Sequence, residues 1–234
     1  MSKEIQFNGN PAIHHDGKTK NTPQRIKPVY LKGLRICLIC FLVLIYPLYR
    51  ILPLWMAWEN NILENTQAVI LLAGFLVALY FAFLTRDTVE TKFWRAIAPF
   101  WLLALGRELS WGRVFLMPIK FTSHGPVFPP MDTIPYHPAI YLVVFLCLVF
   151  GLYSFFKNRC YRILLQSVRQ KRFPILEFAI IIVAAILSTL AEKDHFHLLG
   201  VHNEAMEELL ELLSYMGLFL TQLNFYSQAK PEPN

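Results

Sequence analysis

The sequence predicts an all-α protein: a polytopic membrane bundle of about six transmembrane helices, with both termini in the cytoplasm. Three observations lead to this fold class. Hydrophobic residues make up 55% of the 234 residues, the charged residues fall into a few islands, and six apolar stretches approach the ~20 residues that a helix needs to cross a bilayer. The length is that of one domain.

The stretches are separated by polar connections. The first apolar stretch contains Pro47. Because proline lacks a backbone donor, it predicts a kink in that helix. A disordered basic tail is expected over 1–33, because this segment is polar and rich in Gly and Pro. The helix bundle is expected over 34–226, and a cytoplasmic tail over 227–234. No cleaved signal is expected. The six stretches run from Leu34 to Trp55, Thr66 to Leu84, Phe93 to Trp111, Pro138 to Phe156, Phe173 to Ala191 and Met206 to Phe225.

Lys and Arg outside the stretches alternate between rich and poor connections. The N-terminal tail and the connections after the second and fourth stretches are rich in them, and the others are poor. Because cytoplasmic loops carry the excess of basic residues, this pattern sets the orientation in a bacterial inner membrane. It also accounts for the formal charge of +6. Nucleic acid is therefore excluded as a partner, membrane lipid is expected, and a protein partner or a homo-oligomer stays open.

Two connections and the cysteines allow further expectations. After the fourth stretch, apolar and basic residues alternate from Tyr161 to Arg172, which predicts either an amphipathic helix on the inner leaflet or a solvated loop. The proline-rich loop from Arg113 to His137 predicts a lid that folds against the bundle, a loop that re-enters it, or an extended connector. No disulfide is expected, because none of Cys37, Cys40, Cys147 and Cys160 lies in an outward loop.

Ionisable residues gather at the outward ends of the stretches. Charges near hydrocarbon face partners and indicate functional sites. On the last stretch, Glu204, Glu207, Glu208 and Glu211 follow the spacing i, i+3, i+4 and i+7, which places four carboxylates on one helical face. Acids in a first helical turn favour the helix dipole, which accounts for Glu204 and Glu207 but not for Glu211.

These residues supply the candidate site. Arg50 and Arg107 are expected in structural ion pairs, Arg107 with Glu64 or Glu208. A divalent cation such as zinc is considered as a cofactor, because carboxylates and neutral imidazoles suit that metal. The candidate catalytic residues are Glu108, Glu208, Glu211 and Ser110, and the candidate metal ligands are Glu64, Glu108, His195, His197 and Glu208.

The segment Arg107-Glu108-Leu109-Ser110-Trp111-Gly112, with Glu59, Glu64 and the acids of the last stretch, resembles a group of bacterial multispanning membrane proteins. Members of that group share a Glu-x-Ser-Trp-Gly segment with a further acid before it, where this chain has Arg107. More loosely, the arrangement is similar to the alkaline ceramidase-like superfamily of membrane hydrolases. That resemblance implies an embedded zinc held by three His and an Asp, with a Ser nearby, whereas the last stretch here carries Glu207, Glu208 and Glu211.

Three functional hypotheses follow, and whether the chain is an enzyme stays open. The first is a metal-dependent, membrane-embedded hydrolase or lipid-modifying enzyme, in which the cation activates water and a carboxylate acts as general base. The second is an assembly or partner-binding protein whose polar cluster is structural. The third is a proton- or cation-coupled carrier. Two observations argue against it: the acids lie near one face of the membrane rather than at its midplane, and no inverted repeat is recognisable.

Overall fold

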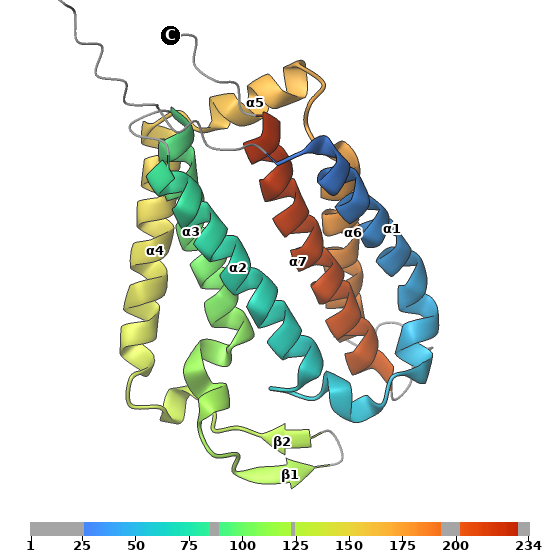
Figure 1. Ribbon diagram of the computed structural model, residues 1–234. Coiled ribbons are helices and arrows are strands. Elements are labelled where there is room, and N and C mark those ends of the chain that lie inside the picture. The colour runs from blue at the N-terminus through green and yellow to red at the C-terminus, as the bar shows by residue number, and fades with distance from the viewer. Residues whose placement is uncertain (1–25, 85–88, 123–124, 193–201, 229–234) are drawn as a thin grey trace, which may run out of the picture.

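Six long helices run roughly side by side, and a short helix crosses their upper end (Figure 1). The computed structural model describes residues 26–84, 89–122, 125–192 and 202–228. The all-α prediction is confirmed, since helices account for most of the described chain. They are α1 (Pro28–Ile51), α2 (Ile62–Leu84), α3 (Val89–Glu108), α4 (His137–Lys157), α5 (Tyr161–Arg169), α6 (Ile175–Glu192) and α7 (Asn203–Gln228).

Each of the six predicted stretches is a long helix, but several boundaries differ. α1 begins at Pro28, inside the predicted tail, because proline is well suited to the first helical position, where no backbone donor is needed. It continues through Pro47. α3 ends at Glu108 rather than at Trp111, because the backbone turns left-handed from Ser110 onward.

The loop between α3 and α4 folds into short elements at the lower end of the bundle. Its buried side chains, Val114, Phe128 and Ile134, show that it packs against the helices and is not an extended connector. Trp58 lies against Gly125, where a Cβ atom would collide with the indole ring. The short elements of the loop are η2 (Ser110–Phe115), β1 (Lys120–Thr122), β2 (Gly125–Val127) and η3 (Met131–Thr133), and η1 (Leu54–Ala57) forms the turn before α2. β1 and β2 pair antiparallel, with Lys120 opposite Val127.

Apolar side chains cover the outside of the bundle. In the described part of the chain, four helices are long and apolar enough to cross a membrane, namely α1, α2 with the turn before it, α4 and α6. Of all the residues in α4, Gly151 alone is buried, and its exposed side chains are mostly Leu, Val, Phe and Tyr. Exposed apolar surface on this scale marks a membrane-facing or partner-facing protein. The four helices are compatible with a membrane protein.

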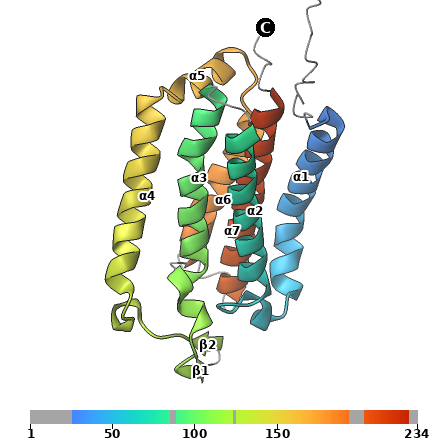
Figure 2. The same ribbon diagram turned by 60° about the vertical axis from the view of Figure 1, so that its left-hand side comes forward.

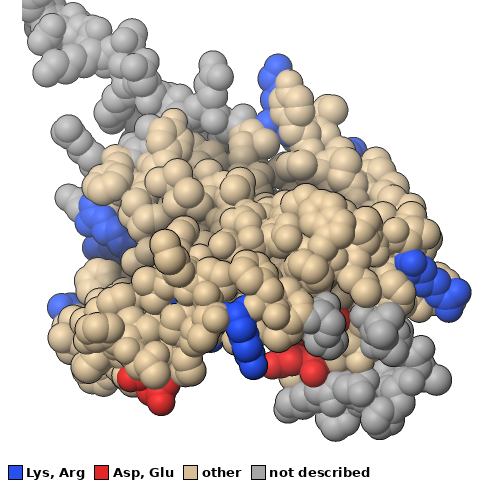
Figure 3. Space-filling model, turned by 90° about the horizontal axis from the view of Figure 1, so that it is seen from below, with Lys and Arg blue, Asp and Glu red and all other residues tan. Residues whose placement is uncertain are grey.

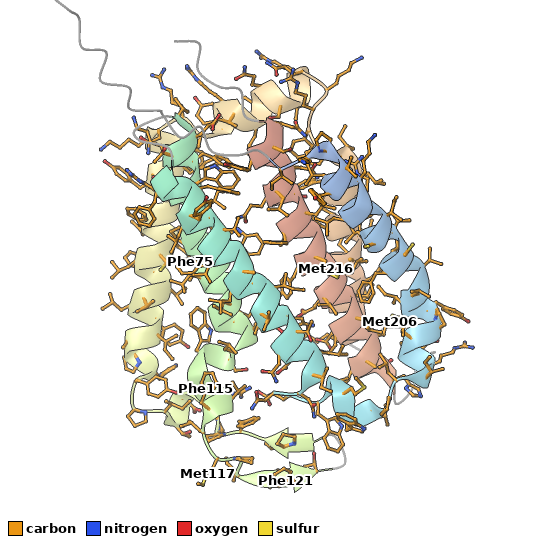
Figure 4. The ribbon with its side chains drawn as sticks, viewed as in Figure 1. Phe75, Phe115, Met117, Phe121, Met206 and Met216 are labelled. Carbon is orange, nitrogen blue, oxygen red and sulfur yellow. The ribbon has the colours of Figure 1, made fainter. Side chains whose placement is uncertain are left out.

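The two more polar helices, α3 and α7, occupy the interior. α7 packs against α1, α2 and α6, and α3 packs against α2 and α4 (Figure 2). α6 and α7 approach closely at Gly217, where a Cβ atom would meet the side chain of Ile181. Met206 and Met216 of α7 pack against the apolar cluster that joins α7 to α1 and α6, and Phe75 of α2 packs in a second cluster (Figure 4). Glu108 of α3 is thus buried between helices, whereas Lys92 and Arg95 near the start of α3 are exposed.

Candidate functional site

Four carboxylates from three helices come together toward the lower end of the bundle. Glu64 lies in the first turn of α2, Glu108 ends α3, and Glu208 and Glu211 lie in the early turns of α7. Glu208 is within electrostatic range of the other three, and Glu108 is within range of Glu64 and Glu211. We call these four residues the carboxylate cluster. Because like charges repel, the cluster attracts positive charge or a proton.

Glu108 is the most enclosed member of the cluster, with 8% of the residue exposed. The hydroxyl of Tyr215 donates a hydrogen bond to its Oε2 at 3.0 Å. Arg107 Nη1 donates to the same hydroxyl oxygen at 2.9 Å. A guanidinium can only donate, so the Tyr215 hydrogen is free to point to Glu108. The phenol therefore fixes the orientation of the carboxylate.

Glu211 supplies the anionic partner of Arg107. Its Oε1 lies 2.8 Å from Arg107 Nη2, and Ser188 of α6 donates to the same oxygen at 3.4 Å. The expected ion pair of Arg107 exists, but the prediction that its partner is Glu64 or Glu208 was wrong. Tyr215 lies four residues after Glu211, on the same face of α7. Arg107 therefore contacts both side chains at once.

Gln67 holds Glu208 in place. This amide is fully buried, and its Nε2 donates to Glu208 Oε2 and to the Glu208 carbonyl, both at 2.8 Å. Among the described residues, its Oε1 has no hydrogen-bond partner. Sequence reasoning missed Gln67, although its position three residues after Glu64, as a polar residue in an apolar helix, was an available signal. It missed Tyr215 as well.

Glu64 closes the cluster from the side of α2. Its carboxylate accepts the backbone N–H of Asn60, which precedes the helix. Such a contact in the first turn satisfies a donor that lacks a partner within the helix. Asn60 in turn donates through its side chain to the carbonyl of Val114 at 3.1 Å. Glu64 is thereby tied to the folded loop below the bundle.

Ser110 belongs to a separate polar group and not to the cluster. Its Oγ donates to Glu59 Oε1 at 3.3 Å, and Arg113 forms an ion pair with the same carboxylate. Ser110 and Trp111 have φ values of 44° and 55°, followed by Gly112 at 87°. Left-handed backbone is costly for residues with a side chain. This turn directs Ser110 to Glu59 rather than to Glu108.

Arg50 was expected to form an ion pair, and among the described residues it forms none. Its Nε donates to the hydroxyl of Tyr49 at 3.0 Å, and its guanidinium lies over the ring of Tyr46, 4.7 Å from the centroid. Guanidinium groups bind aromatic faces in this way. Two tyrosines of its own helix therefore hold Arg50.

Some of the predicted metal ligands lie within the described residues and others do not. His195 and His197 lie outside the described residues. Within the described ranges, no three His, Cys, Asp or Glu side chains are close enough together to hold a metal ion. Glu64, Glu108 and Glu208 thus do not form a zinc site by themselves, and the described residues do not fit the metal-dependent hypothesis.

Seen from below, the end of the molecule that carries this site is mostly uncharged, with a few acidic and basic groups (Figure 3). The described surface at this end therefore carries few charges. No protein-family model, curated protein or solved structure matches this chain.

Proposed function

We propose that this chain is a multi-pass protein of the bacterial inner membrane, with six spanning helices and both termini in the cytoplasm. The apolar outer helices support this proposal, and so does the burial of the polar α3 and α7 between them. The distribution of basic residues gives the orientation. The end with α5 carries Lys157, Arg159, Arg162, Arg169, Lys171 and Arg172, whereas the opposite end carries Arg50, Arg107, Arg113 and Lys120.

We further propose that the carboxylate cluster is the acid–base site of a membrane-embedded hydrolase or lipid-modifying enzyme. One observation carries this proposal. Glu108 and Glu208 are oriented by the uncharged donors Tyr215 and Gln67, while among the described residues neither carboxylate pairs with Lys or Arg. A carboxylate that is held in place but not neutralised remains free to exchange a proton.

The chemistry follows from two such groups beside each other. In the hydrolysis of an ester or amide, one carboxylate takes a proton from water as the water oxygen bonds to the carbonyl carbon. The neighbouring carboxyl group then gives a proton to the leaving oxygen or nitrogen as its bond to carbon breaks. Arg107 is a positioning residue here, because it acts through Tyr215 and Glu211. The surrounding apolar helices suit a lipid or lipid-like substrate.

A lipid-hydrolysis assay tests the proposal. The purified protein is incubated with a panel of phospholipids and lipid amides, and released fatty acid is measured by mass spectrometry. Glu108→Gln and Glu208→Gln should each lower the rate at least about 100-fold, which is the usual contribution of a general acid or base. Glu192→Gln, an exposed acid at the end of α6, is the matched control. Equal rates in all four proteins would contradict the proposal.

Elemental analysis of the same samples tests the metal-dependent alternative. A metal present in stoichiometric amount in the wild type and lost in Glu108→Gln and Glu208→Gln would assign the cluster to metal binding, together with residues such as His195 and His197. Retention of full activity by the chelator-treated protein would support acid–base chemistry by the carboxylates themselves.

A partner-binding role is the second candidate function, and one observation favours it. Three large apolar side chains at the lower tip, Phe115, Met117 and Phe121, are among the most exposed in the molecule (Figure 4). Clustered exposed apolar residues mark interaction sites. If this role holds, the double variant Met117→Ser with Phe121→Ser should no longer form chemical crosslinks to a partner or a second copy. Unchanged lipid hydrolysis in the same double variant would show that partner binding and the enzymatic role are separate.

A further inference from the structure

The opposite end of the molecule holds a cavity that the proposed function does not use. It has a volume of about 310 Å³ and lies among the start of α3, the helix α5 and the end of α7. Phe93, Trp94 and Phe225 supply apolar walls, and Arg162 and Arg172 supply positive charge. A concave site with apolar walls and a few polar groups is the usual form of a small-ligand site.

Both arginines are available to a ligand. Neither side chain has an ion pair or hydrogen bond within the described chain, and both are exposed. Glu90 also lines the cavity but already has an interaction of its own. Two arginines beside one cavity suit the oxygens of a phosphate group, which accept paired hydrogen bonds from guanidinium.

The backbone places Arg172 at the cavity. α5 ends with the N–H of Arg172 bonded to the Ser167 carbonyl at 2.9 Å and that of Lys171 to the Val168 carbonyl at 3.0 Å. Lys171 has a φ of 54°. This combination is the Schellman arrangement, which turns the chain sharply after a helix. Arg172, after the end of α5, thereby lines the same cavity as Arg162 in the first turn of that helix.

A buried acceptor indicates what the phosphate is attached to. Gln228 lines the same cavity, and its Oε1 is buried without a hydrogen-bond partner among the described residues. A buried acceptor without a partner is destabilising, so this oxygen favours a ligand that brings a donor. The hydroxyl groups of a phospholipid headgroup provide such a donor next to the phosphate.

The outer face of α5 indicates that this ligand comes from the bilayer. Tyr161, Leu165 and Val168, spaced i, i+4 and i+7, form an exposed apolar stripe, whereas Ile163 and Leu164 pack against the bundle. The helix crosses the end of the bundle (Figure 1). A basic amphipathic helix in this position rests at the level of the lipid headgroups.

We propose that this cavity binds the headgroup of an anionic phospholipid, with Arg162 and Arg172 on the phosphate and Gln228 on a headgroup hydroxyl. This inference needs the chain to lie in a bilayer, as proposed above, but not the acid–base role of the carboxylate cluster. The lipid positions α5 against the bundle. Binding is expected to be selective for anionic over zwitterionic lipids, because the cavity carries a net positive charge.

Native mass spectrometry of the full-length protein tests the assignment, with phosphatidylglycerol and phosphatidylcholine as probes. The wild type should retain phosphatidylglycerol, and Arg162→Gln with Arg172→Gln should weaken retention about tenfold, as expected when charge-assisted hydrogen bonds are lost. Arg169→Gln removes an arginine of the same helix that does not line the cavity, so this control should retain the lipid as the wild type does.

Two results would overturn the proposal. Equal retention of phosphatidylglycerol by the double variant and the wild type would show that general attraction to the basic surface is sufficient. Displacement of the lipid by millimolar inorganic phosphate would assign the cavity to a soluble phosphate compound. Loss of lipid hydrolysis in Glu108→Gln with normal lipid retention would separate the cavity from the carboxylate cluster.

Discussion

Tyr215 of α7 donates its hydroxyl to Glu108 of α3 at 3.0 Å, and both groups are buried. This contact links the two polar helices inside the bundle. Because Arg107 donates to the same hydroxyl oxygen, a single phenol connects a cation to a carboxylate that has no basic partner of its own among the described residues.

Removal of the phenol oxygen should disturb both stability and activity. Tyr215→Phe leaves Glu108 without its donor, so we expect a loss of about 1.5–3 kcal/mol in the free energy of unfolding, as for hydrogen bonds to charged groups. Thermal unfolding in detergent measures this change. Tyr80→Phe, on the exposed face of α2, is the control and should be neutral. Equal melting temperatures for the two variants would contradict the structural role of the Tyr215 hydroxyl.

The ion pair near the upper end should respond asymmetrically to mutation. Glu177 is 1% exposed and is held by Arg35 Nη2 at 2.6 Å and by Asn224 at 3.3 Å. Arg35→Met leaves a buried carboxylate without a cation, so it should cost about 3 kcal/mol or more. Glu177→Gln leaves an arginine that can reach solvent, and it should cost less.

The double variant checks this explanation. Arg35→Met combined with Glu177→Gln removes the buried charge together with its partner, so it should be more stable than Arg35→Met alone. Chemical denaturation in detergent gives the three values. A double variant as unstable as the sum of the two single variants would mean that the two side chains are not coupled.

Two glycines of similar helical setting should respond in opposite directions. Gly74 of α2 lies against the Trp101 ring, and a Cβ atom there would collide with the indole. Gly74→Ala should therefore destabilise the fold by about 1–3 kcal/mol through overpacking. Gly33 of α1 has no atom within 4 Å of a built Cβ, so Gly33→Ala should stabilise by up to about 1 kcal/mol. Melting temperatures decide the signs.

Membrane orientation can be tested with a thiol reagent that does not cross the membrane. In a variant lacking the four native cysteines, Met117→Cys should react from outside intact spheroplasts, because residue 117 lies on the exposed lower tip. Gln170→Cys, on the exposed surface at the end of α5, should react only after the membrane is opened. The reverse labelling pattern would invert the proposed topology.

Much of the fold could be predicted, because a run of about 20 apolar residues has few other structures available to it. All six predicted stretches are helices, and the basic segment from Tyr161 is also a helix. Whether this segment is an amphipathic helix or a solvated loop was left open by the sequence, and which of its apolar residues face outward was not predicted. The predicted helix ends were less accurate. The third stretch was expected to be helical to Trp111, but the left-handed backbone at Ser110 and Trp111 ends the helix earlier.

The candidate site was predicted in outline only. The periodicity of Glu208 and Glu211 placed both on one face of a helix, and the structure brings them to Glu64 and Glu108. The partners of these acids were not predictable in the same way. Arg107 contacts Glu211 rather than Glu208, and Ser110 contacts Glu59 rather than any member of the carboxylate cluster.

The sequence by itself determined that the chain forms apolar helices and that four glutamates of the last helix share one face, because both properties depend on spacing within each segment. Tertiary structure alone decided that α3 and α7 lie inside, that Gln67 and Tyr215 hold two of the acids, and that Arg162 and Arg172 share a cavity. The physical reason is that contacts between helices depend on the rotation and depth of each helix. Packing sets these two quantities, and no single segment specifies them.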